Sequence, residues 1–187
     1  MATTKKPPAK KALAKKSAPR KTTAPAKKAP RTRADATTLL AKDHKDVKAL
    51  FKRYDKLTKA EADGSERQEL AEQICQMLTV HATIEEEIFY PAAREAEVES
   101  DLLDEAEVEH ASAKDLIAQI KAMGPDEELY DAKVKVLGEY INHHVQEEEG
   151  EMFPKCRKAD MDLADLALQL SERKAELMEE LGEEQPA

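Results

Sequence analysis

Two stretches of the sequence repeat a pattern that combines an imidazole with a carboxylate at helical spacing. In the first stretch, His81 is followed four residues later by Glu85, and an aromatic residue and a proline come shortly afterwards. In the second stretch, His144 and Glu148 stand in the same relation, again ahead of an aromatic residue and a proline. Residues four apart lie one above the other on a helix face, so each pair would present a nitrogen and an oxygen donor in one direction. Two such pairs facing each other would suit one or two transition-metal ions.

Two further histidines fall inside apolar stripes of predicted helices. His44 lies between Leu40 and Val47 in one stripe, and His110 occupies the same kind of position in another helix. A lone histidine on an apolar face is more often a hydrogen-bonded core residue than a metal ligand. Here, however, four consecutive helices each place one histidine inward and two of them add a glutamate, and burying these groups without partners would cost several kcal/mol per charge. Because a metal ion would offset that cost, the pattern predicts a buried metal site.

Some polar neighbours of these residues are not expected to be ligands. His143 falls one residue away from the apolar stripe, which predicts a solvated side chain or one that supports a ligand from behind. Glu86 and Glu87 are predicted to point away from the inner seam of their helix, because neighbouring residues lie on different faces.

Beyond about residue 35, apolar residues recur at three- and four-residue spacing. This periodicity predicts helices at about residues 36–57, 66–89, 100–123, 127–150 and 161–181. Ser65 with Gln68 forms a capping box for the second helix. Pro91 marks the approximate end of that helix, with continuation past a kink at the proline as the alternative. Asp126 can cap the fourth helix. No strand signal is present, so the sequence predicts an all-α fold: an up-and-down four-helix bundle with a short extra C-terminal helix.

The charged residues divide the chain into two parts of opposite character. Of the 30 Lys and Arg residues, 12 lie in residues 1–33, which contain no Asp or Glu, although the whole chain has a net charge of -9. Such a Lys/Ala/Pro-rich segment cannot bury enough apolar surface to offset its ordering entropy, which predicts a disordered basic tail over residues 1–34. The other predicted domains are a bundle over residues 35–156 and a C-terminal amphipathic helix and tail over residues 157–187.

The basic tail would act as an electrostatic arm that neutralises phosphates of DNA or another polyanion, with binding that weakens as salt rises. Two plainer interpretations stay open: a solubilising tail, and an arm that contacts the protein's own acidic domain. A helix needs about 20 consecutive apolar residues to cross a membrane, and no apolar run in the sequence approaches that length. The N-terminus also lacks the apolar core of a secretory signal. We therefore expect a cytoplasmic protein without a membrane partner, associated with the nucleoid if the arm binds DNA.

The order and spacing of the candidate ligands resemble those of a known family. His44, His81-x-x-x-Glu85, His110 and His144-x-x-x-Glu148 follow one another as in the hemerythrin-like family, also called the HHE cation-binding domain. The resemblance covers about residues 35–156 and implies a bundle around two non-haem iron ions. It implies that Glu85 and Glu148 bridge the irons and that the terminal ligands are His44, His81, His110 and His144. It also implies that O₂ or another small oxidant binds at an open iron position.

One position departs from the hemerythrins that carry O₂. Those proteins place a second histidine one turn after the third-helix ligand, where this chain has Lys114. Unless His143 or a water fills the gap, fewer histidines are available as ligands. The difference favours a sensor, a protein that handles iron or an oxidant, or a site with an exchangeable water over reversible O₂ transport.

Other classes of protein compete with this interpretation. A ferritin-like bundle needs two Glu-x-x-His motifs, and only Glu107 with His110 provides one. A second hypothesis is a nucleic-acid-associated protein whose bundle is an iron- or redox-responsive module. A third is a peroxide-consuming di-iron enzyme, but enzyme function is the less favoured interpretation. Classes built on a Gly-rich phosphate loop or a nucleophile elbow lack their motifs here.

Overall fold

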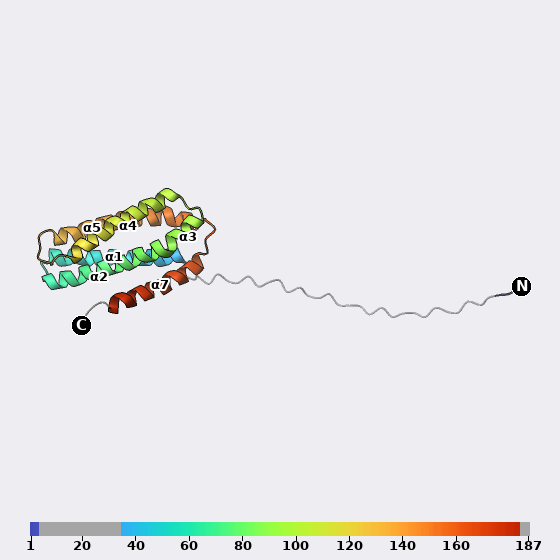
Figure 1. Ribbon diagram of the computed structural model, residues 1–187, viewed down its shortest axis with the longest axis horizontal. Coiled ribbons are helices and arrows are strands. Elements are labelled where there is room, and N and C mark those ends of the chain that lie inside the picture. The colour runs from blue at the N-terminus through green and yellow to red at the C-terminus, as the bar shows by residue number, and fades with distance from the viewer. Residues whose placement is uncertain (4–34, 184–187) are drawn as a thin grey trace. The chain divides into compact units, whose positions relative to one another are not determined.

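The computed structural model describes residues 1–3 and 35–183. The predicted basic tail falls on residues 1–34, of which 4–34 lie outside the described residues. Within residues 35–183 every regular element is a helix (Figure 1), which confirms the predicted all-α class. No helix among the described residues is both long enough and apolar enough to span a membrane.

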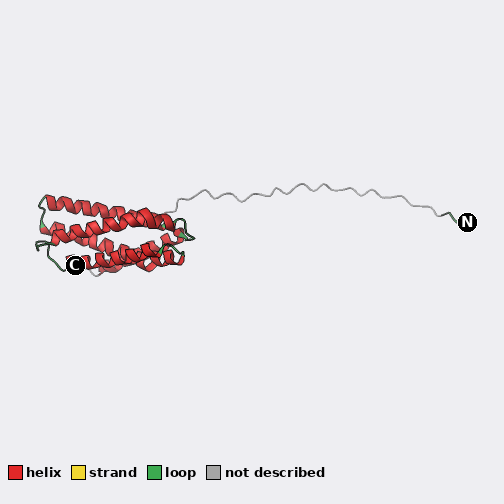
Figure 2. Cartoon of the chain, turned by 90° about the horizontal axis from the view of Figure 1, so that it is seen from above, coloured by secondary structure: helices red, strands yellow, loops and turns green. Residues whose placement is uncertain are grey.

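Among the described residues, four helical rods form the bundle and a fifth helix packs on its side; Figures 1 and 2 show how they are arranged. In chain order the elements are α1 (Ala36–Lys59), α2 (Gly64–Ile84), η1 (Glu85–Phe89), α3 (Tyr90–Glu95), α4 (Ser100–Lys121), α5 (Tyr130–Glu147), η2 (Glu148–Met152), α6 (Phe153–Cys156) and α7 (Leu163–Glu183). The segments α2, η1 and α3 form one continuous rod, and α5, η2 and α6 form another. Helix α1 packs against α2 and α5, α4 packs against the same two helices, and α7 lies on α1 and α2. The predicted four-helix bundle with an extra C-terminal helix is thus confirmed, although α7 is as long as α2, at 21 residues.

Two rods continue past a proline because each contains one wide π-helical turn. Proline lacks an N–H group, and its ring clashes with the carbonyl group four residues earlier in a regular α-helix. The turns η1 and η2 end two residues before Pro91 and Pro154, respectively. Their wider backbone makes room for the proline ring and lets the rod continue. The second rod therefore ends at Glu95, not near Pro91, and the fourth also extends beyond its predicted end.

Both predicted helix caps are wrong. Asp63, not Ser65, caps α2: its carboxylate accepts a hydrogen bond from the Ser65 backbone N–H at 2.8 Å. Asp126 lies in the loop before α5 and does not cap it. Helix α5 instead follows Leu129, which has a left-handed backbone with φ of 77° and no side-chain cap. Local turn geometry therefore decided where these two helices begin.

The apolar core is divided into two clusters along the bundle axis. The first lies toward the α1–α2 loop and includes Val47, Leu78, Ala113, Ile117, Ile141 and Val145. The second lies toward the π-helical turns and includes Leu40, Ile84, Phe89, Ala106, Met152 and Phe153. On every rod, the residues between these clusters are the histidines and glutamates that the sequence singled out. A layer of buried polar side chains thus crosses the bundle between two apolar layers.

Candidate metal centre

All six predicted site residues lie in this polar layer. Helices α1, α2, α4 and α5 each supply one histidine, and η1 and η2 each begin with one glutamate. The six residues are His44, His81, Glu85, His110, His144 and Glu148. The most accessible of them, His81, exposes only 7% of its surface. The structure therefore brings together every residue of the predicted set, from four separate rods.

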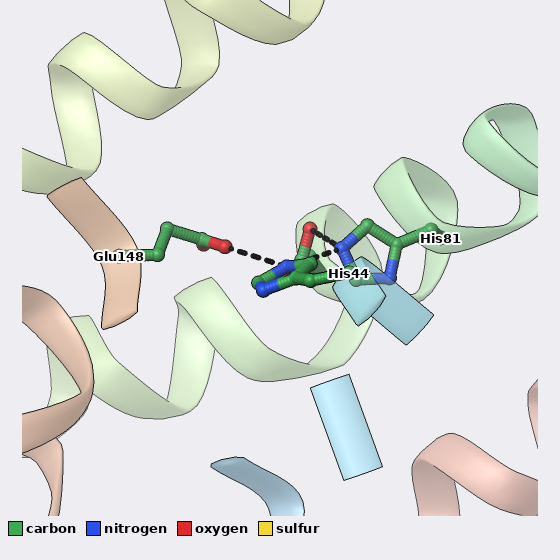
Figure 3. A group of neighbouring side chains, drawn as sticks. His44, His81 and Glu148 are labelled. Atoms are coloured by element: carbon green, nitrogen blue, oxygen red, sulfur yellow. Dashed lines mark hydrogen bonds and ion pairs between the residues drawn. The ribbon is translucent and has the colours of Figure 1, made fainter. Parts of the chain in front are cut away.

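The four imidazoles turn their Nε2 atoms toward one another. His44 Nε2 lies 3.0 Å from His81 Nε2, and His110 Nε2 lies 3.2 Å from His144 Nε2. Glu148 reaches both pairs, because its Oε2 is 3.2 Å from His44 Nε2 and 3.5 Å from His144 Nε2. Figure 3 shows His44 between His81 and Glu148. Nitrogen and oxygen donors thus converge on a common centre.

Glu85 makes the equivalent contacts from the opposite side of the layer. Its Oε2 lies 3.2 Å from His81 Nε2 and 3.5 Å from His110 Nε2. Each carboxylate therefore stands between a histidine of the first two helices and a histidine of the last two. The donor atoms form two groups, and within each group all atoms lie within 4.8 Å of one another. One group is His44, His81, Glu85 and Glu148, and the other is Glu85, His110 and His144. The shared position of Glu85 suits a bridge between two neighbouring ions.

Several buried donor atoms of the layer lack hydrogen-bond partners among the described residues. They are both carboxylate oxygens of Glu85, Oε2 of Glu148 and Nδ1 of His81. Burial, together with the nearby Glu148, raises the pKa of the Glu85 carboxyl well above its usual range. Unpaired buried oxygens are costly, whereas a cation would satisfy them. The residues therefore fit a bound cation.

Burial also keeps two of the histidines neutral. It lowers the pKa of His81, and burial together with the neighbouring His144 lowers the pKa of His110 to about 4. A neutral imidazole has a free lone pair on one nitrogen, which a metal ligand requires.

A second set of carboxylates holds the histidines from behind, through their Nδ1 atoms. The Nδ1-to-carboxylate distances are 3.0 Å for His44 and Glu149, 3.0 Å for His110 and Glu86, 2.8 Å for His144 and Glu109, and 3.6 Å for His81 and Asp43. For His44, His110 and His144, the carboxylate accepts a hydrogen bond from Nδ1–H, which leaves the Nε2 lone pair free to bind a metal. These three carboxylates thus fix both the orientation and the tautomer of their rings, whereas Asp43 lies beyond hydrogen-bond distance of His81.

The prediction that Glu86 points away from the site is wrong. Its carboxylate reaches Nδ1 of His110, and Lys114 also donates to it, at 2.5 and 2.7 Å. The wide turn η1 rotates neighbouring residues less far apart than an α-helix does, so Glu86 stays close to the inner face. Glu87 does point outward, where Arg173 of α7 pairs with it.

The outer carboxylates had a signal in the sequence that residue-by-residue reasoning missed. Each half of the bundle has an acid directly before its first histidine and a second glutamate directly after its inner glutamate. These residues are Asp43 and Glu86 in the first half, and Glu109 and Glu149 in the second half. The repeat gives the site an approximate two-fold symmetry between the α1–α2 and α4–α5 pairs.

The aromatic residue directly after each wide turn covers one histidine, and here the symmetry is broken. The ring of Phe153 stacks on His44 at 5.8 Å between centroids, and that of Tyr90 stacks on His110 at 5.5 Å. The Tyr90 hydroxyl donates a hydrogen bond to Glu148 Oε1 at 2.9 Å, a contact that Phe153 cannot make. One side of the centre therefore has a hydrogen-bond donor that the other lacks.

Helix α7 is linked to the site through Asp43. Lys174 Nζ lies 2.5 and 2.6 Å from the two oxygens of this buried carboxylate, whose other neighbour is His81. Because breaking a buried ion pair leaves an uncompensated charge, it costs about 3–5 kcal/mol. Lys174 is partly exposed, so we expect Lys174→Met to lower the free energy of unfolding by about 2–3 kcal/mol.

Urea denaturation would measure this change. The matched control is Lys155→Met, which removes an exposed ion pair with Glu99 and should change the free energy of unfolding by less than about 0.5 kcal/mol. Equal effects of the two substitutions would contradict the role assigned to Lys174.

His143, whose role the sequence left open, and Lys114, which stands where the O₂-carrying hemerythrins have a histidine, lie outside the polar layer. The side chain of His143 is 65% exposed and contacts Glu109 and Glu147, not the converging Nε2 atoms. Lys114 is also largely exposed. Neither replaces a histidine at the centre.

The space beside the centre is small. A cavity of about 20 Å³ is lined by the four buried histidines and by apolar residues such as Val47, Leu78 and Ile141. A larger pocket of about 230 Å³ lies beside α4 and α5, with His110 and His144 in its wall. The inner cavity has room for about one water-sized molecule.

These features define a class: a helical bundle with a buried cluster of histidines and glutamates suited to binding metal cations. The chain belongs to the Hemerythrin HHE cation binding domain family, whose family model matches residues 35–156. A crystal structure of a Hemerythrin HHE cation binding domain-containing protein from Mycobacterium kansasii has a similar fold. It superposes with a TM-score of 0.63 at 23% identity, covering 76% of this chain and 86% of that one.

A curated protein that this chain resembles is named DNA nickase, from Nostoc sp. (strain PCC 7120). The two are 34% identical over 115 residues, which are 62% of this chain. The match spans only 31% of the nickase, so most of that protein has no counterpart in this alignment.

Proposed function

We propose that the polar layer binds two non-haem iron ions, and that the protein binds or senses O₂ or a related small oxidant, or handles iron. The ligands would be His44, His81, Glu85, His110, His144 and Glu148. The observation that carries the proposal is the convergence of four Nε2 atoms on two buried carboxylates with unpaired oxygens. When bound, the irons would supply binding and redox chemistry toward the oxidant.

The charges around the layer support two ions and not one. Two divalent cations would bring four positive charges, of which the inner glutamates offset two. Of the outer carboxylates, Asp43 and Glu86 are paired with Lys174 and Lys114. Glu109 and Glu149, which have no lysine or arginine partner among the described residues, supply the further negative charge. Mixed imidazole and carboxylate donors suit iron, although zinc and manganese accept them too.

The size of the inner cavity supports a small ligand. About 20 Å³ accommodates a water-sized molecule but no organic substrate. The Tyr90 hydroxyl, which donates to Glu148, would orient this inner carboxylate within the polar layer. These features favour binding or sensing over turnover of a bulky substrate.

The metal proposal is tested by measuring the metal content and the optical absorption spectrum of the purified protein. Protein purified without oxygen should contain two irons per chain, and exposure to air should produce a new charge-transfer absorption band. Element analysis and absorbance spectroscopy measure both properties. One zinc per chain, or a folded protein that contains no metal and takes up none when iron is added, would overturn the proposal and make the histidines structural.

A second function, association with DNA, is supported by two further observations. Residues 1–33 carry 12 basic residues and no acid, and a similar protein is named DNA nickase. Backbone phosphates bind such segments without sequence specificity, and affinity falls steeply as salt rises. We propose that this segment tethers the bundle to DNA or to another polyanion, as an iron- or redox-responsive module.

Deletion of residues 1–33 should abolish salt-sensitive DNA binding and leave the metal content unchanged. Fluorescence anisotropy with a labelled duplex, at low and at physiological salt, measures the affinity. Replacing the twelve basic residues by glutamine provides a control that keeps the chain length. Undetectable binding of the full chain even at low salt would exclude the tether.

A further inference from the structure

The two halves of the site differ in how their outer carboxylates are neutralised. Asp43 of the first half is paired with the ammonium group of Lys174. Glu109 occupies the equivalent place in the second half, directly before a buried histidine and hydrogen-bonded to the next one, His144. Within residues 35–183, no Lys or Arg side chain forms an ion pair with Glu109. The negative charge that α7 neutralises on one side is therefore not neutralised by a cationic chain on the other.

In place of a lysine, Glu109 faces a histidine and a second glutamate. His143 Nε2 lies 3.6 Å from Glu109 Oε1 and 3.3 Å from Glu147 Oε1. The three residues can each offer one ligand atom, with all three atoms within 4.8 Å of one another. His143 and Glu147 are four residues apart on α5, so the helix itself holds this pair on one face.

The spacing of these donors matches that around a small metal ion. Zinc binds imidazole and carboxylate donors at about 2.0–2.2 Å, and tetrahedral geometry at that length separates neighbouring donors by about 3.4 Å. The distances from His143 Nε2 to the two glutamate oxygens, 3.3 and 3.6 Å, lie on either side of this value, and all three donor atoms lie within 4.8 Å of one another. Three protein ligands would leave the fourth position for water.

We propose that Glu109, His143 and Glu147 form a third metal site, on the outside of the bundle, that binds a divalent transition-metal ion such as Zn²⁺. This site is separate from the buried layer, because none of its three residues belongs to the converging set. It is accessible to solvent, since the side chains are 25%, 65% and 34% exposed, respectively. Its ion would therefore exchange readily with solution.

The outer site shares one residue with the support of the buried centre. Glu109 presents Oε1 to His143 and Oε2 to His144 Nδ1, at 2.8 Å. An ion on Oε1 would withdraw negative charge from the carboxylate that holds the His144 ring. The outer ion would thus occupy the place that Lys174 holds beside Asp43, and neutralise the equivalent carboxylate.

Titration of the full chain with zinc tests the proposal. Isothermal calorimetry and equilibrium dialysis measure the number and the affinity of the zinc sites. We expect His143→Ala and Glu147→Gln each to lose one class of zinc site that wild type has. The matched control is Glu139→Gln, which lies two turns earlier on α5 in an exposed pair with Lys135 and should bind zinc as wild type does. Circular dichroism checks that each variant is folded, and Glu147→Gln preserves the size of the side chain.

The experiment compares the number of classes of zinc site in wild type and in each variant. Its result therefore does not depend on whether the buried centre also takes up zinc. Glu85→Gln, which alters only the buried layer, should keep the outer class of site. If His143→Ala and Glu147→Gln both bind zinc as wild type does, the outer site does not exist. Loss of the same class in Glu139→Gln would show binding to surface carboxylates in general, and would equally overturn the proposal.

Discussion

Glu85→Gln is expected to remove the stabilisation that metal gives to the protein, while leaving the metal-free protein at least as stable as wild type. Glutamine keeps the size of the side chain but is a poor bridge between two cations. In the metal-free protein, both Glu85 oxygens are buried and unpaired, so a neutral amide relieves a penalty instead of adding one. The substitution should therefore act in opposite directions on the two forms.

Thermal unfolding with and without added iron, under anaerobic conditions, measures both effects. A ligand at a thousand times its dissociation constant stabilises the folded state by about 4 kcal/mol, and this increment should largely disappear in the variant. Glu87→Gln is the matched control, because Glu87 lies in the same turn but points outward to Arg173. A metal-dependent increment that persists in Glu85→Gln would contradict the bridging role.

The second large effect is expected from two adjacent histidines on α5. His144→Ala should abolish loading of the buried centre with two irons, because its Nε2 converges with that of His110 at 3.2 Å. His143→Ala should retain that centre, because the side chain of His143 is 65% exposed and directed away. The two substitutions remove the same chemical group one residue apart, so each controls for the other.

Iron content and the charge-transfer spectrum distinguish the two variants. Loss of the ligand should reduce bound iron to one ion or none in His144→Ala, with an altered spectrum. His143→Ala should match wild type in both properties of the buried centre. Equal loss of iron in the two variants would show that the inward face of α5 has been assigned incorrectly.

The fold class and the inner six residues could be predicted from the sequence because both depend on local helical phase. Spacings of three and four residues place His81 with Glu85, and His144 with Glu148, on the same face of a rod whatever surrounds it. Four rods with one histidine each in an apolar stripe can bury those histidines only together. Their meeting in one layer therefore followed from the pattern, although the pattern did not give the distances between them.

The helix ends were less predictable because they depend on backbone geometry that several residue types permit. Asp63 caps α2 in place of Ser65, and a left-handed residue, Leu129, precedes α5 in place of a side-chain cap. A proline usually signals the end of a helix, but the wide turns η1 and η2 absorb Pro91 and Pro154. Whether a helix stops or widens at a proline depends on what the rest of the rod packs against.

Only the tertiary structure decided which charged groups surround the inner residues. Glu149 reaches His44 across 105 positions of the chain, and Lys174 reaches Asp43 across 131. These contacts depend on which rods are neighbours and on the local width of η1 and η2, and neither property can be read from the spacing within one helix. The sequence by itself thus determined the inner donors, because one helix fixes their direction. The contacts of the outer carboxylates with the histidines, the pairing of α7 with one half of the site and the exposed cluster around His143 required the packing of several helices.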